Sequence, residues 1–134
     1  MMAALAQTRR NAPNQPVAPT IGPLAAPVVA LRESAVVGMP ATQTQEVRVM
    51  TATFAPGGRT PLHSHRWPVT VYVLEGHFTL EVEGQAPVVF GPGQAFVEQP
   101  GAVHTGHNRD AQRALRVVIF YVSEPGTPFL DPAG

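Results

Sequence analysis

Hydrophobic and polar residues alternate along several short stretches of this chain. In the stretch 78–82 (FTLEV), Phe78, Leu80 and Val82 share one face and the polar residues share the other. A period of two is typical of a β-strand, whose successive side chains point to opposite faces. The stretch 47–54 (VRVMTATF) has the same period, although both of its faces are partly apolar. Since no stretch shows a helical period, the pattern predicts an all-β protein.

Turns rich in glycine and proline separate these stretches at nearly regular intervals. Such spacing is typical of an antiparallel sandwich or barrel, and a barrel of about eight strands has room for one small ligand. The most hydrophobic stretch, 114–122 (ALRVVIFYV), is expected to be a central strand. We predict strands at 28–37 (short, at an edge), 47–54, 69–74, 78–82, 88–90, 95–98, from 103 onward, and 114–122. The expected core includes Val49, Val71, Val73, Phe96, Val117 and Ile119.

The length of 134 residues predicts a single domain. Residues 1–27 are rich in Ala, Pro, Asn and Gln without an apolar period, and we interpret them as an N-terminal arm. Residues 28–125 are expected to form the β-barrel domain, and the Pro/Gly-rich residues 126–134 a tail over its surface.

Composition excludes several classes of function. The formal net charge is zero and no basic cluster follows Arg9 and Arg10, so a nucleic-acid partner is not expected. No apolar stretch is long enough to span a bilayer, so no membrane partner is expected either. Because the chain has no cysteine, a metal would need histidine or carboxylate ligands. The cytoplasm is the default compartment, with the periplasm as the alternative if a signal peptide precedes the given start.

Three histidines point to a metal site. His63 and His65 are two residues apart at the start of a strand-forming run, so their side chains lie on one face of an extended chain. His104 lies far downstream in a second Gly/Pro-rich turn. A pair on one strand and a distant third histidine predict a mononuclear site assembled across a sheet, with His63, His65 and His104 as ligands.

Other polar residues are candidates for supporting roles. Glu98 ends a strand and could act in the barrel as a base or substitute ligand, although a strand-end glutamate is more often solvated. Asn108 could orient a ligand or substrate, with turn chemistry as the alternative. Arg59 could pair with an anionic substrate, although a solvated arginine is the commoner case. By strand parity, His77 and His107 should face outward.

Two motifs resemble those of the cupin superfamily, small β-barrels with a jelly-roll topology. The first motif, G-x5-H-x-H-x(3,4)-E-x6-G, is matched by Gly57, His63, His65 and Gly76. The second, G-x5-P-x-G-x2-H-x3-N, is matched by Gly93, Gly101, His104 and Asn108, with Gln99 at the proline position and Pro100 one place later. The carboxylate position of the first motif falls on Val69. The resemblance, over residues 47–122, therefore implies a three-histidine site without the usual glutamate.

Three neutral imidazoles leave the full charge of a divalent transition metal uncompensated, which favours a small anionic or enolisable substrate. Similar sites in thiol, diketone-cleaving and gentisate dioxygenases imply Fe(II), while imidazole ligands would also suit Zn, Mn, Ni or Cu. Whether the protein is an enzyme stays open, and as an enzyme it would be a metal-dependent dioxygenase. A non-catalytic small-ligand or sensor barrel and a Lewis-acid isomerase or lyase are the alternatives. The resemblance also implies a homodimer.

Overall fold

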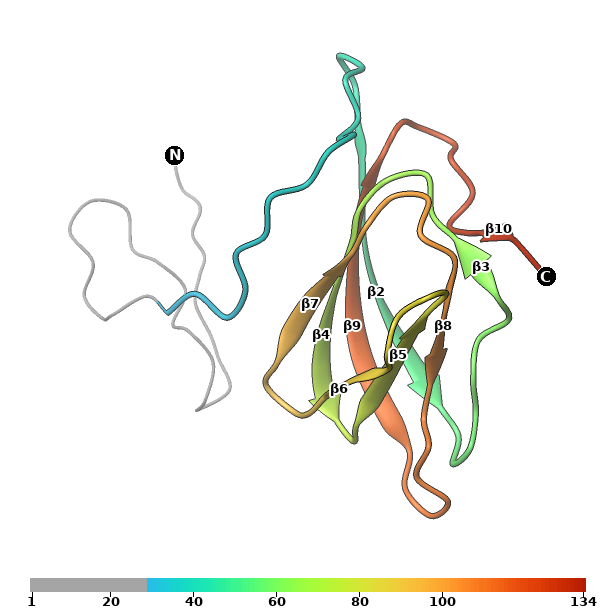
Figure 1. Cartoon of the computed structure of the whole chain (residues 1–134). Helices are drawn as coiled ribbons and strands as arrows, with labels where there is room; N and C mark the ends of the chain where they lie inside the picture. The colour runs from blue at the N-terminus through green and yellow to red at the C-terminus, as the bar shows by residue number, and fades with distance from the viewer. Residues whose placement is uncertain (1–28) are drawn as a thin grey trace. The chain divides into compact units, whose positions relative to one another are not determined.

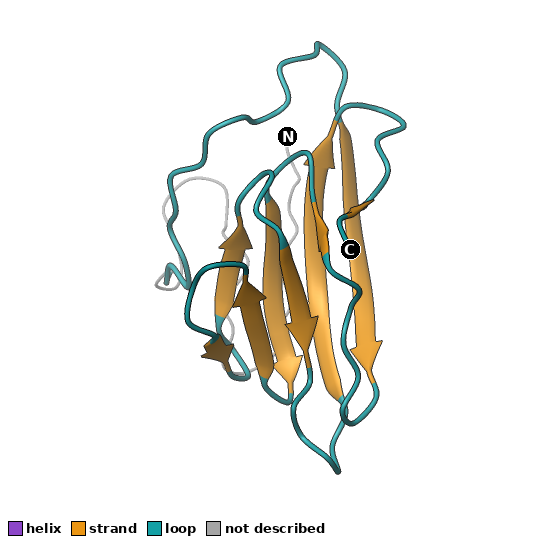
Figure 2. Cartoon of the chain, turned by 45° about the vertical axis from the view of Figure 1, so that its right-hand side comes forward, coloured by secondary structure: helices purple, strands orange, loops and turns teal. Residues whose placement is uncertain are grey.

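The computed structural model describes residues 29–134, which contain strands and no helix (Figures 1 and 2). The strands are β2 (Glu46–Phe54), β3 (His63–Ser64), β4 (Val69–Glu75), β5 (Phe78–Val82), β6 (Val88–Phe90), β7 (Ala95–Glu98), β8 (His104–His107), β9 (Leu115–Ser123) and β10 (Asp131–Pro132). Along this part of the chain, no helix is long and apolar enough to cross a membrane. The all-β prediction is confirmed.

The strands of the unit formed by residues 34–134 pair into two antiparallel sheets. One sheet has the order β10-β3-β8-β5-β6 and the other has the order β2-β9-β4-β7 (Figure 1). Strand β9 lies between β2 and β4, which confirms the central position expected of the most hydrophobic stretch. Consecutive strands mostly alternate between the two sheets, which is the jelly-roll arrangement.

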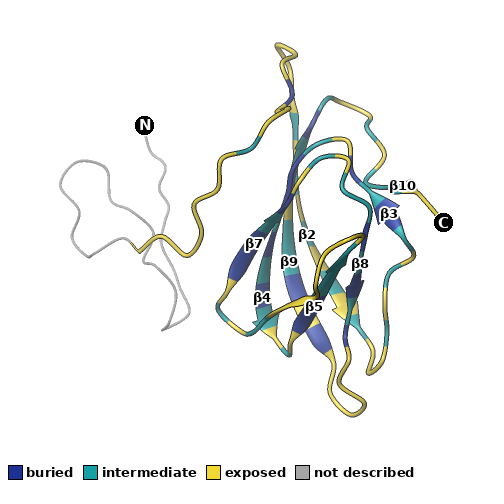
Figure 3. Ribbon diagram, viewed as in Figure 1, coloured by how far each residue is buried: buried dark blue, intermediate teal, exposed yellow. Residues whose placement is uncertain are grey.

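The core lies between the sheets and is formed mainly by the inward faces of β4 and β9 (Figure 3). Strand β4 alternates buried and partly exposed positions, so its period of two is visible in the burial pattern. The buried hydrophobic side chains of this cluster are Val69, Val71, Val73, Phe78, Phe96, Leu115, Val117 and Tyr121.

Strand β2 turns the face that carries Met50 and Phe54 toward the core. Val49 is 62% exposed, so its predicted place in the core is wrong. Met50 and Phe54 instead pack against the core cluster. In the ladder between β2 and β9, Met50 is paired with Ile119, which packs against the same cluster. Both faces of this strand are partly apolar, so only its register against β9 decides which one is buried.

The structure differs from our prediction in residues 29–37 and adds a strand in the C-terminal tail. Residues 29–37 form no strand, so the short edge strands predicted for 28–37 are not found in the described residues, and Val37 is 87% exposed. The arm predicted for 1–27 lies outside the described residues. In the tail predicted for 126–134, Asp131 and Pro132 form β10, which pairs with Ser64 and His63 of β3.

Candidate metal centre

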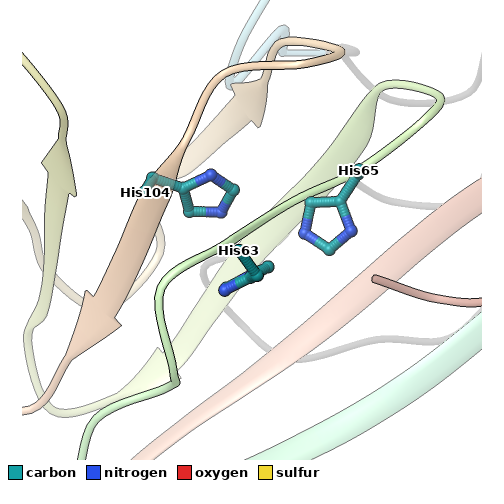
Figure 4. A group of neighbouring side chains, drawn as sticks. All are labelled: His63, His65 and His104. Atoms are coloured by element: carbon teal, nitrogen blue, oxygen red, sulfur yellow. The ribbon is translucent and has the colours of Figure 1, made fainter. Parts of the chain in front are cut away.

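The three predicted histidines come together between the two sheets. His63 on β3 is paired with His104 on β8, and His65 follows β3 directly, so ladder pairing and the two-residue spacing place all three on the inner face. Their side chains are buried, and the ring nitrogens that could bind a metal all lie within 4.8 Å of one another. Figure 4 shows the three rings converging from the two chain segments.

Backbone carbonyls fix how each imidazole is turned. Nδ1 of His63 is 2.6 Å from the carbonyl oxygen of Pro61, and Nδ1 of His104 is 2.9 Å from that of Ala102. Nδ1 of His65 is 2.5 Å from the carbonyl oxygen of Phe129. A carbonyl accepts only, so each Nδ1 must carry a proton, and each neutral ring then directs the lone pair of Nε2 toward the centre. This is the tautomer that a metal ligand needs.

Glu98 faces the same centre from β7. Its Oε1 is 3.4 Å from Nε2 of His65, and its Oε2 is 3.2 Å from Nε2 of His104. In the ladder between β4 and β7, Glu98 is directly opposite Val69, the position where the cupin motif would have its carboxylate. The neighbouring strand therefore supplies a buried carboxylate close to the place where the motif lacks one.

The donor set fits a cation. Nε2 of His104 is buried without a hydrogen-bond partner, and lone pairs of nitrogen and carboxylate oxygen face one another there. Burial raises the pKa of Glu98, but His104 and His65 outweigh burial and lower it to about 2. Burial lowers the pKa of His104, but Glu98 outweighs burial and raises it. The arrangement thus favours a positive charge between these groups, which a proton or a divalent metal ion would supply.

Burial favours the neutral form of His63. Burial lowers its pKa, and the neighbouring His104 and His65 lower it further against the opposing effect of the Pro61 carbonyl. A neutral imidazole is the form that binds a metal. The residues that could hold the ion are therefore His63, His65 and His104, with Glu98 as the adjoining carboxylate.

Phe129, in the C-terminal tail, completes the surroundings of His65. Its ring centroid is 4.8 Å from that of His65 and 5.4 Å from that of Tyr121. Its carbonyl oxygen accepts the hydrogen bond that orients His65. Sequence reasoning missed this residue because it is a single apolar side chain in a Pro/Gly-rich tail, and no motif or period marks it.

A small cavity adjoins the histidines inside the barrel, and we call it the inner cavity. His63, His65 and Glu98 line part of it, and its volume is about 40 Å³. Its wall is otherwise almost wholly apolar and includes Phe54, Val71, Phe78, Val117, Ile119 and Phe129. Such a wall gives the candidate site an apolar surrounding on one side.

Arg59 is turned away from the histidines. Its Nη2 donates to Oε1 of Glu81 at 2.8 Å, and Arg109 and His107 approach the other carboxylate oxygen at 2.5 and 3.5 Å. Hydrogen bonds from Arg109 and Thr105 are the main causes that lower the pKa of Glu81 to about 2. The predicted outward direction of His107 is confirmed. The contacts around Glu81 connect Arg59, in the loop before β3, with β5 and β8.

Asn108 is fully buried, and its hydrogen bonds go to the backbone of nearby turns. Its Nδ2 donates to the carbonyl oxygens of Phe54, Ala55 and Arg113, and its Oδ1 accepts from the backbone N–H of Asp110. These contacts correspond to the turn chemistry that we considered as the alternative role. His77 is exposed, as strand parity predicts.

No curated protein matches this sequence. Among solved structures, the polyketide cyclase RemF from Streptomyces resistomycificus is 26% identical, with a TM-score of 0.56 over 66% of this chain and 61% of that one. A cupin-like protein from Thermotoga maritima is also 26% identical, with a TM-score of 0.55 over 66% and 65% of the two chains. The chain thus spans less than two thirds of the length of either protein.

A third similar structure is the DMSP lyase DddQ from Ruegeria pomeroyi, which is 20% identical, with a TM-score of 0.57 over 65% of this chain and 43% of that one. At this identity the likeness concerns the fold alone. The family model for the cupin domain matches residues 50–121, which contain both motifs' histidines and nearly all of the two sheets. The chain is therefore a member of the cupin family.

Proposed function

We propose that this cupin is a mononuclear metal-dependent enzyme of the oxygenase type, acting on a small anionic or enolisable substrate. The observation that carries the proposal is the convergence of three Nε2 lone pairs beside a buried carboxylate. His63, His65 and His104 would hold one divalent transition metal, with Fe(II) favoured and Zn, Mn, Ni or Cu as alternatives. When bound, the metal supplies Lewis acidity and, in the case of iron, redox chemistry with dioxygen.

The residues around the site have separate tasks in this proposal. The carbonyls of Pro61, Ala102 and Phe129 hold the three rings in the metal-binding tautomer. Glu98 faces the site, and its carboxylate oxygens are placed where they could accept a proton from an enolisable substrate bound there. No arginine lines the inner cavity, so an anionic group of the substrate would have to bind at the metal itself.

A Lewis-acid isomerase or lyase is the second candidate. Glu98 favours it, because a buried carboxylate beside a metal site can move a proton without any redox step. RemF, which is similar over most of the barrel, is a polyketide cyclase by name, so cupin barrels of this kind are not confined to oxygenases. A non-catalytic ligand-binding barrel would use the same residues without turnover.

Elemental analysis beside oxygen uptake tests the proposal. The protein is purified without chelator, as the wild type, as His104→Ala, and as His77→Ala, which removes an exposed histidine. We expect about one transition metal per chain in the wild type and His77→Ala, and less than a tenth of that in His104→Ala. Oxygen uptake is then measured with enolisable dicarbonyls, aromatic hydroxy acids and small thiols.

Uptake in proportion to substrate consumed would support the oxygenase. Substrate conversion without oxygen uptake would support the isomerase or lyase instead. If none of these compounds is converted by the metal-loaded protein, the ligand-binding alternative is favoured. Absence of metal from the wild type, even after incubation with Fe(II) or Zn(II), would refute the metal site.

We also propose that the chain forms a homodimer through the outer face of the sheet that contains β2 and β9. Val47, Val49 and Phe120 are 66%, 62% and 41% exposed there. Val49 is paired with Phe120, so the exposed apolar groups are contiguous. Within the described residues, β2 is also an edge strand of nine residues. A second copy would cover both the apolar face and the edge.

A further inference from the structure

A second cavity reaches the same site from another side, and we call it the outer cavity. It lies where β5 of one sheet approaches β7 of the other, and His104 and Glu98 form its inner end. Leu80, Val82 and Ala102 supply apolar walls. Gln85 and Gln99, both exposed, stand at its solvent end, so the cavity opens to solvent between them.

The candidate ligands form the partition between the two cavities. His63 and His65 line the inner cavity, His104 lines the outer one, and the carboxylate of Glu98 borders both. An ion held by the three histidines would therefore be open to two separate spaces. Two molecules could reach it by different routes.

The volumes of the two cavities select what each can hold. The inner cavity has about 40 Å³, which suits a molecule as small as water or dioxygen. The outer cavity has about 190 Å³, enough for an organic molecule of several heavy atoms. The outer cavity is thus the larger of the two and offers the better fit to an organic substrate.

The lining of the outer cavity also selects the chemistry of its ligand. Glu98 is its only carboxylate, and no arginine lines it, so a second anionic group distant from the metal would be unpaired. The amide side chains of Gln85 and Gln99 can each donate and accept a hydrogen bond. They suit a neutral polar group such as a hydroxyl or a carbonyl.

We propose that the outer cavity is the organic substrate's binding site, with Gln85 and Gln99 as specificity-determining residues at its entrance. The substrate is a small molecule with an apolar body and a neutral hydrogen-bonding group at the end away from the metal. The inner cavity receives only the small co-reactant, dioxygen or water. This inference rests on the proposed metal-dependent function and adds a binding route and a substrate class to it.

The test uses Co(II)-loaded protein, because the visible spectrum of Co(II) reports a bound ligand without any turnover. The probes are azide, which is small, and 4-phenylimidazole, which is bulky and uncharged. Ala102→Trp fills the outer cavity, and Gln99→Trp obstructs its entrance from an exposed position. Ala111→Trp, in the exposed loop between β8 and β9, is the matched control.

We expect Ala102→Trp and Gln99→Trp to weaken 4-phenylimidazole binding at least tenfold and azide binding less than twofold. Ala111→Trp should bind both probes as the wild type does. In the Gln85→Leu/Gln99→Leu double variant, 4-(4-hydroxyphenyl)imidazole should lose at least fivefold in affinity relative to 4-phenylimidazole. A fivefold change corresponds to about 1 kcal/mol, the usual contribution of one hydrogen bond.

The outcomes separate this inference from the function on which it rests. If the wild type binds Co(II) and azide but both tryptophan variants keep full affinity for 4-phenylimidazole, the outer cavity is not the binding route. The metal-dependent function would then still stand. If the wild type binds no Co(II), the proposed function is refuted and the inference with it.

Discussion

Replacing Phe129 by alanine tests whether the C-terminal tail is part of the candidate metal centre. The ring of Phe129 packs on His65 with a centroid distance of 4.8 Å and on Tyr121 at 5.4 Å. Strand β10, which follows it, has only two residues, so the ring is a main anchor of this segment. The backbone carbonyl that accepts from His65 remains in the variant, but its position would no longer be fixed.

The expected magnitudes follow from this packing. Removing a fully buried phenylalanine side chain costs about 3–5 kcal/mol. Phe129 is only partly buried, so we expect the free energy of unfolding to fall by about 2 kcal/mol, or the melting temperature by about 8 °C. Loosening the hydrogen-bond partner of a metal-binding histidine typically costs about 10-fold to 100-fold in affinity, and we expect about 10-fold because the carbonyl is retained.

Metal affinity is measured by competition with a chromophoric chelator, and stability by thermal and urea unfolding of the metal-free protein. Leu130→Ala is the matched control, since Leu130 is the adjacent, partly buried residue of the same tail. We expect this control to keep wild-type metal affinity within about twofold. If Phe129→Ala loses stability but keeps full metal affinity, or if both variants lose affinity equally, the tail does not orient His65 as we argue.

Three further predictions concern the scaffold. The folded-state pKa of Glu81 is lowered to about 2, so its stabilisation is present above the ordinary value and is lost as pH falls from about 5 to 2. Glu81→Gln should therefore lower the free energy of unfolding by about 1 kcal/mol at pH 7, where solvent screens the cluster, and by much less near pH 2. Urea titrations at both pH values check this, and equal losses at both would contradict it. Gly106→Ala should cost about 1–3 kcal/mol, because the added Cβ would lie 2.5 Å from Cζ of Phe78. The loss should shrink in a Phe78→Leu background, and an equal loss in both backgrounds would exclude this clash as its cause. Phe120→Glu should convert the proposed dimer into monomers in sedimentation velocity runs, whereas Val89→Glu, exposed on the other sheet, should not. A wild type that is monomeric at all concentrations would refute the dimer.

Local sequence patterns predicted much of this protein. Alternation and turn residues located β2 and the strands from β4 to β9 to within about two residues, because the period of a strand is a local property. The same parity argument placed His63 and His65 on one face and His107 on the other. With the downstream His104, this was enough to predict the three candidate ligands, which the pairing of β3 with β8 brings together.

Other features depended on pairing between distant segments. Both faces of β2 are partly apolar, so only its ladder with β9 decides that Met50 is inside and Val49 outside. Residues 29–37 have the composition of an edge strand but form none, since a strand also needs a partner.

The candidate site also combines features that local sequence predicts with features that depend on contacts between distant segments. The sequence by itself identified the three histidines as candidate metal ligands, because their spacing and motifs are local. Only the tertiary structure placed Glu98 opposite Val69 and against two of the rings, and it alone brought Phe129 to His65 across 64 positions. Cross-strand register and the path of a tail are set by the summed packing of the whole barrel, and no short stretch of sequence encodes them.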